Sequence, residues 1–179
     1  MESRRGQLLI ASSSLRDPNF MKTVVLIVDD GENGALGVIL NRPLELSVAE
    51  ACGEKIEAAS EVTEPLHQGG PVEGPLSVLH TNPAIGGADV CEGVRFCMDK
   101  DDLEWIMQHN KGPVKFFAGY SGWGEGQLDA EIEHGSWLLT PATAEHIFEK
   151  QGDWSKLTTW MQLGKSVNIE RIPDDPSVN

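Results

Sequence analysis

The sequence predicts a single α+β domain in which a mixed, bifurcated β-sheet is flanked by helices. Short strand and helix candidates follow one another irregularly along the 179 residues, without the even strand–helix rhythm of a doubly wound parallel sheet. Two neighbouring strand candidates are separated only by turn-forming residues, which predicts an antiparallel hairpin. With 40% apolar residues, a chain of this length can bury roughly 70% of the surface that its unfolded form exposes.

Strand candidates dominate the first part of the chain. Gln7–Ala11 and 23–28 are rich in branched apolar residues, and 35–40 reads as the returning strand after a loop at 29–34. Because both arms of this hairpin are almost entirely apolar, we expect central strands that are covered on two faces. Pro43 cannot donate a backbone hydrogen bond, and we expect the second arm to end before it.

Helix candidates begin with a short segment at Ser47. This serine is followed three residues later by Glu50, which gives it the form of a capping box. The remaining strand candidates are 76–80, 94–98, 114–118 and 137–139. The remaining helix candidates are 99–107, 127–133, 141–149 and 156–163. We expect one domain over residues 1–172 and a flexible tail at 173–179.

Composition argues against several classes of function. Lys and Arg total 14 against 28 Asp and Glu, so the formal net charge is -14, and direct nucleic-acid binding is not expected because it depends on basic residues that neutralise phosphates. Three cysteines without a Cys-x-x-Cys pair suggest neither a disulfide framework nor a zinc site. No apolar run approaches the roughly 18 residues of a membrane helix. The cytoplasm is the predicted compartment.

The segment from Gly119 to Trp137 is the most unusual part of the sequence. It begins with four glycines in eight residues and leads directly into a helix candidate. Glycine either permits positive φ or lets another group approach the backbone closely, and it weakens a regular element. This segment therefore requires unusual backbone geometry.

Catalytic and cofactor motifs are incomplete. Gly119–Trp123 begins like the Gly-x-Ser-x-Gly elbow of hydrolases, with Ser121 as the nucleophile, but its last position is Trp. Gly122–Gln127 lacks the final glycine of a dinucleotide fingerprint. The five histidines show no metal-binding spacing. We therefore expect neither a cofactor nor a metal ion.

Two further features invite a functional interpretation. Gly69 and Gly70 precede a proline, and such a pair suits close backbone contact or the edge of a ligand. His80 ends a strand candidate, where its side chain could reach a pocket. A packed, hydrogen-bonded histidine and a catalytic one both remain open at this stage.

Six blocks of sequence resemble, in order, the YqgE/AlgH family. They are Leu8–Ala11, Asp17–Phe20, Gly34–Pro43, Gly69–Val72, Leu79–His80 and Gly122–Leu128. The resemblance implies a bacterial cytoplasmic protein whose bifurcated mixed sheet curls into a pseudo-barrel. It also implies a family without an established enzymatic activity, whose members are described as transcriptional regulators.

Our first hypothesis is a non-catalytic regulatory or adaptor domain that binds a protein or small ligand. Trp123 is its candidate anchor, and it is either presented on an exposed loop or packed as a lid on the core. A second is a hydrolase that uses Ser121 or His80, with Asn41 or backbone amides stabilising a developing anion. A third is a transcriptional regulator that acts on DNA directly. The expected ligand or partner surface comprises Asn41, Arg42, Gly69, Gly70, His80, Ser121 and Trp123.

Overall fold

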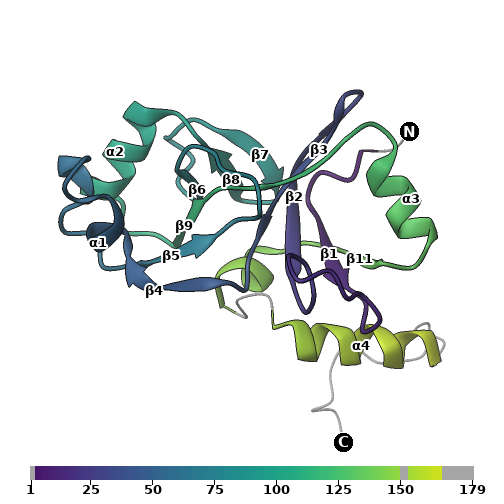
Figure 1. Cartoon of the computed structure of the whole chain (residues 1–179). Coiled ribbons are helices and arrows are strands. Elements are labelled where there is room, and N and C mark those ends of the chain that lie inside the picture. The colour runs from purple at the N-terminus through teal and green to yellow at the C-terminus, as the bar shows by residue number, and fades with distance from the viewer. Residues whose placement is uncertain (1–2, 150–152, 167–179) are drawn as a thin grey trace, which may run out of the picture.

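The computed structural model describes residues 3–149 and 153–166 and confirms the predicted α+β class. Its strands form two sheets that lie next to each other in Figure 1. The five-stranded sheet has the order β10 (Ser121–Trp123), β3 (Gly34–Ile39), β2 (Val24–Gly31), β1 (Gln7–Ala11), β11 (Trp137–Pro141). The six-stranded sheet has the order β4 (Pro43–Ser47), β5 (Pro65–Gln68), β9 (Val114–Ala118), β6 (Ser77–His80), β8 (Val94–Cys97), β7 (Ala88–Cys91).

The predicted mixed sheet is thus divided in two. β5 and β9 pair in parallel, whereas the other neighbouring strands pair in antiparallel fashion. The chain passes between the sheets where β3 leads to β4 and where β9 leads to β10. Within the described residues neither sheet closes on itself, so each keeps two edge strands.

The helices lie on the outside of the two sheets. They are α1 (Val48–Cys52), α2 (Lys100–His109), α3 (Gln127–Glu133) and α4 (Trp154–Ser166), with a 3-10 turn at Glu57–Ala59 and a π turn at Glu145–Glu149. In Figure 1, α1 and α2 lie beside the six-stranded sheet, and α3 and α4 lie beside the five-stranded sheet. The predicted tail at 173–179 lies outside the described residues.

Alternate residues of the central strands enter different hydrophobic clusters. In β1, Leu8 and Ile10 pack in a cluster with Phe117 of the other sheet, whereas Leu9 and Ala11 pack on the opposite face of the strand. These four side chains are fully buried. Strands whose side chains alternate between two apolar layers must be apolar throughout, which explains their sequence.

The hairpin is longer than its sequence suggested. β2 extends to Gly31, and the predicted loop at 29–34 shrinks to the two residues between the strands. A register shift between Ile27 and Asp29 places one extra residue in β2, as a β-bulge does. The aspartates at the end of β2 therefore pair with β3 instead of forming a loop.

Two prolines lie in strands. Pro43 does end the hairpin arm, but it also begins β4, an edge strand in which a missing N–H costs no ladder hydrogen bond. Pro141 ends β11 opposite Gln7 and does not open a helix. The predicted helix at 141–149 is therefore wrong in its first half, and the π turn occupies its second half. The capping box at Ser47 is confirmed, with the Ser47 and Glu50 side chains each bonded to the other's backbone N–H.

The two sheets meet at a backbone contact, here called the sheet junction, formed by Gly69–Gly70 and Gly119–Ser121. The N–H of Gly69 donates to the carbonyl of Ala118 at 2.9 Å, and the Gly69 carbonyl accepts from the N–H of Ile39 at 2.8 Å. The Ser121 hydroxyl donates to the same carbonyl at 3.1 Å. Gly119 has φ of 71°, which favours glycine, where the chain turns from β9 to β10.

We expect Gly70→Ala to weaken the fold by about 3 kcal/mol or more, because overpacking forces the backbone apart. A Cβ at Gly70 would lie 2.2 Å from the carbonyl carbon and oxygen of Tyr120. Gly31→Ala is the matched control, since a Cβ there meets no heavy atom within 4 Å. Urea unfolding of both variants measures the difference, and equal stabilities would contradict the proposed role of the junction.

Candidate functional site

The predicted surface residues do not form one exposed patch. Gly69, Gly70 and Ser121 do come together, but they do so at the sheet junction, where all three are buried. The Ser121 side chain has no solvent-accessible surface, and its hydroxyl is used by the Gly69 carbonyl. These residues therefore hold the two sheets together.

Asn41 and Arg42 brace the loop that precedes β2. The Asn41 side chain accepts from the N–H of Val24 and donates to the carbonyl of Lys22, both at 2.9 Å. The Arg42 guanidinium donates to the carbonyl of Asn19 at 2.6 Å. Both side chains are half-buried and engaged with backbone groups of this loop.

Trp123 is a core residue, as in the second of the two positions considered for it. Only 4% of its surface is exposed. Its ring stacks on Phe20 at a centroid distance of 5.8 Å and meets Trp137 edge-on at 6.1 Å. The indole N–H groups of Trp123 and Trp137 both donate to one carboxylate oxygen of Glu131, at 2.9 and 2.8 Å. This pair of hydrogen bonds fixes α3 against the five-stranded sheet.

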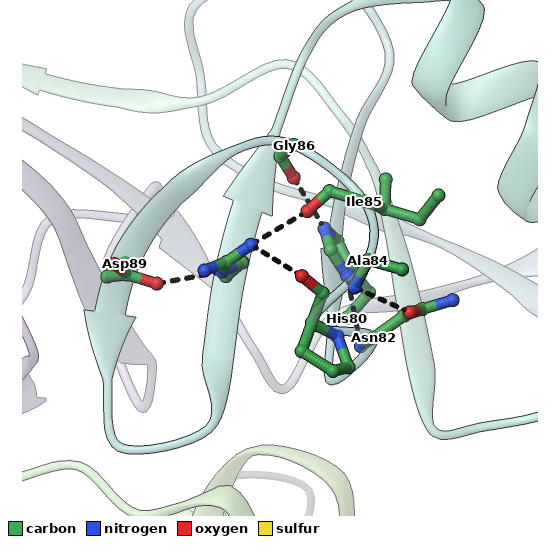
Figure 2. A network of polar contacts seen from close by, with 8 residues as sticks. His80, Asn82, Ala84, Ile85, Gly86 and Asp89 are labelled. Carbon is green, nitrogen blue, oxygen red and sulfur yellow. Dashed lines mark hydrogen bonds and ion pairs between the residues drawn. The ribbon is translucent and has the colours of Figure 1, made fainter.

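His80 holds the loop that follows β6. Figure 2 shows its ring between two backbone groups of this loop, with Nδ1 3.2 Å from the N–H of Asn82 and Nε2 3.0 Å from the carbonyl of Gly86. Nδ1 therefore accepts and Nε2 donates, as in a neutral ring. Burial lowers the pKa of His80. Arg95 holds the same loop by donating to the carbonyl of Ile85 at 2.9 Å.

The structure does contain an open cavity at the glycine-rich segment, here called the glycine cleft, of about 600 Å³. It lies between the tip of the β2–β3 hairpin and the loop Gly124–Gly126 that precedes α3. Gly34, at the tip, approaches this loop so closely that a Cβ would lie 2.1 Å from the Trp123 carbonyl oxygen. The cleft is lined by Ser3, Arg4, Asp30, Gly31, Glu32, Gly34, Ala35, Gly124, Glu125, Gly126, Leu128 and Asp129.

The glycine cleft is negatively charged. Its lining includes four carboxylates and one guanidinium. Arg4 pairs with Asp129 at 2.5 Å, and its backbone N–H donates to Asp30 at 2.6 Å. Glu32 and Glu125 are exposed and form no hydrogen bond or ion pair with any residue in the described ranges. Their carboxylates remain available to a positively charged ligand.

A second cavity, here called the lysine pocket, has a volume of about 210 Å³. Its buried wall is formed by His67 of β5 and Lys115 of β9, which are 5% and 6% exposed. Its mouth is formed by exposed residues, namely Pro43, Glu64, Pro65 and Pro113. Val114 and Phe148 complete the lining.

Both ionisable groups of the lysine pocket are shifted by burial. Burial lowers the pKa of Lys115 to about 8. Burial and the nearby Lys115 charge lower the pKa of His67 to about 4, so this ring is neutral at pH 7. Buried Nδ1 of His67 has no hydrogen-bond partner in the described part of the chain. Shifted groups of this kind in a cavity mark a candidate functional site.

Sequence reasoning missed the lysine pocket. The available signal was Lys115, the single charged residue within the strand candidate 114–118, because a lysine is rarely fully buried unless it is paired. His67 was counted only for metal-ligand spacing. Its proximity to Lys115 depends on the parallel pairing of β5 with β9, which sequence spacing does not reveal.

Across 3–149 and 153–166, no helix is long and apolar enough to cross a membrane. In the same ranges, no three His, Cys, Asp or Glu side chains lie close enough together to hold a metal ion.

Comparison with known proteins places nearly the whole chain in one group. A family model described as AlgH-like matches residues 8–167. A UPF0301 protein from Chlorobium limicola is 43% identical over 184 residues, which cover 98% of this chain and 96% of that protein. A UPF0301 protein from Chlorobaculum tepidum is 39% identical over 184 residues, with coverage of 97% and 95%.

Two solved structures share the fold. The solution structure of the AlgH protein from Pseudomonas aeruginosa matches with a TM-score of 0.73 at 26% identity, over 97% of this chain and 96% of that one. A crystal structure of a protein from Corynebacterium diphtheriae matches with a TM-score of 0.70 at 24% identity, over 88% of this chain and 86% of that one. The likeness to the second structure concerns the fold alone.

His67 makes stability depend on pH in a defined window. Its pKa is about 4 in the folded protein against an ordinary value of 6.5, so between these values the unfolded chain binds more protons. Stability therefore falls as the pH drops from 6.5 to 4, by about 2 to 3 kcal/mol from this group. Between pH 7 and pH 4, the free energy of unfolding measured with urea should fall in both proteins. We expect the fall to be smaller in His67→Gln than in the wild type, by roughly the same 2 to 3 kcal/mol.

The exposed His109 provides the control for this measurement. His109→Gln should follow the wild-type pH dependence, because its side chain lies outside the lysine pocket. Parallel curves for the wild type and His67→Gln would show that the buried ring is not the source of the acid sensitivity.

Proposed function

The chain belongs to the AlgH-like family, and from this premise we propose that it is a non-catalytic regulatory or adaptor domain of the cytoplasm. Its glycine cleft binds a positively charged segment of a partner protein. The observation that carries this proposal is the open, acidic cavity formed by the glycine-rich segment. The catalytic candidates, in contrast, are buried and engaged with the backbone.

The construction of the glycine cleft supports a binding role. Glycines at Gly31, Gly124 and Gly126 leave parts of the hairpin tip and of the opposite loop without side chains, so a ligand can approach the backbone closely. The volume of about 600 Å³ falls within the usual range of binding cavities, roughly 300–1,000 Å³. Excess carboxylates in the lining favour a cationic segment and speed its diffusional approach.

The hydrolase alternative has weaker support. A nucleophilic serine needs a base within hydrogen-bond reach and access to substrate. Ser121 has no exposed surface and donates to Gly69, while His80 is bound to the loop after β6. Neither side chain lines the glycine cleft or the lysine pocket.

The alternative of direct DNA binding is also weaker. A net charge of -14 repels phosphates, and the glycine cleft adds local negative charge. A regulatory effect on transcription through a partner protein is compatible with the proposed adaptor role. Retention on promoter DNA that disappears with added salt would favour direct binding instead.

Filling the glycine cleft should abolish binding without harming the fold. A Cβ at Gly124 meets only the Gln127 side chain, at 3.9 Å, so Gly124→Leu is expected to fold normally and to occupy the cavity. We expect an arginine-containing tetrapeptide to shift the amide resonances of Gly31, Gly34 and Gly124 in the wild type. Its affinity should fall by about tenfold or more in Gly124→Leu, as expected when a ligand loses its cavity.

Gly122→Leu is the matched control, because Gly122 lies in β10 outside the lining and a Cβ there makes only ordinary contacts. This variant should bind the tetrapeptide like the wild type. A glutamate-containing tetrapeptide of the same length should cause no shifts. If both peptides bind equally well, or if Gly124→Leu retains full affinity, the glycine cleft is not the binding site.

A further inference from the structure

We propose that the lysine pocket binds a small carboxylate with an apolar body, with the acid group on Lys115 and the body against the proline-rich mouth. The ligand is a short-chain monocarboxylic acid. This site is distinct from the glycine cleft, because the linings of the two cavities share no residue.

The geometry of Lys115 is that of a cation that lacks its counter-ion. In the parallel pair of β5 and β9, His67 lies opposite Phe117. Lys115 precedes Phe117 by two residues, so its side chain lies on the same face of the sheet as His67. Its ammonium donates to the carbonyl of Leu40 at 3.3 Å. An ammonium has three donors, and no carboxylate in the described ranges lies within ion-pair distance of this one.

A buried charge without a partner is costly to the fold, by several kcal/mol for an isolated ion. Burial alone accounts for the lowered pKa of Lys115, without a neighbouring charge that favours or opposes it. A carboxylate in the pocket would supply the missing ion pair and use donors that the protein leaves free. The neutral His67 lies on the same wall and offers a second polar contact.

The remainder of the pocket selects the ligand's shape and charge. Pro43, Pro65 and Pro113 at the mouth have no backbone N–H, so they provide apolar surface and a rigid rim but no additional anion donors. Phe148 adds an aromatic surface. Glu64 at the mouth disfavours ligands with several negative charges, such as phosphate. The volume of about 210 Å³ lies below that of drug-binding pockets, roughly 300 Å³ and more, and suits a short acid.

The test uses the full chain, labelled with ¹⁵N, and three probes at constant ionic strength and pH 7: sodium butyrate, its neutral analogue butyramide, and sodium phosphate. We expect butyrate to cause saturable shifts at the amides of Leu66–Gln68 and Val114–Phe117. The affinity for butyramide should be lower by at least about tenfold, because butyramide cannot form the ion pair. Phosphate should be a weaker ligand than butyrate.

Lys115→Met tests the residue directly. It removes the charge but keeps the length and apolar stem, and replacing an unpaired buried charge by an apolar side chain is tolerated by the fold. This variant should lose butyrate binding, whereas the exposed Lys55→Met should keep it. Glu64→Gln leaves the buried wall intact and should bind butyrate about twofold more tightly, because it removes a like charge from the mouth.

Several results would overturn the proposal. They are equal affinities for butyrate and butyramide, full butyrate affinity in Lys115→Met, phosphate binding tighter than butyrate, and the absence of saturable shifts up to roughly 50 mM butyrate, well above the Kd expected of so small a ligand. Failure of the tetrapeptide experiment on the glycine cleft would not affect this outcome, because the amides that report on the two cavities are different.

Discussion

The close approach of two backbone segments at the sheet junction is the constraint on which the rest of this structure depends. Gly69 carries hydrogen bonds from β3 and from Ser121 on a single carbonyl, and it donates to the end of β9. A side chain on Gly70 would force these segments apart, as the 2.2 Å distance to Tyr120 shows. Because both sheets are held there by backbone groups, the junction fixes where the flanking loops emerge, including the loop that forms the glycine cleft.

Local sequence patterns predicted those elements whose own residues determine them. Val114–Ala118 and Gln127–Glu133 were predicted with the bounds that the structure has, because a compact apolar run and a helix-spaced pair of apolar residues are local signals. β4, β5, β7 and β10 were missed. They are short, and three of them are edge strands with exposed or polar residues, so pairing with a neighbour determines them more than composition does.

Unusual backbone geometry could be inferred from the sequence, whereas the surroundings of individual side chains could not. The glycine-rich segment required unusual geometry, and the structure shows that one part of it forms the sheet junction and another part forms the cleft. Gly69 and Ser121 were both expected on a ligand or partner surface. In the structure they lie together but buried, because burial depends on the arrangement of two sheets. His67 and Lys115 are 48 positions apart and become neighbours only through parallel pairing, which no periodicity along the chain encodes.

The hydrogen bond from Lys115 to the carbonyl of Leu40 gives the two cavities a common mechanical element. β3 begins at Gly34, in the wall of the cleft, and the chain reaches Leu40 directly after it ends. A strand that is hydrogen-bonded on both sides is stiff, because stretching it would lengthen its bonds to both neighbouring strands. A small displacement at one end is therefore passed on to the other end. An acid that binds the remaining donors of this ammonium is therefore held by a group that is bonded directly after the far end of the same strand. Any resulting change in affinity at one end must be matched at the other, because thermodynamic linkage is reciprocal.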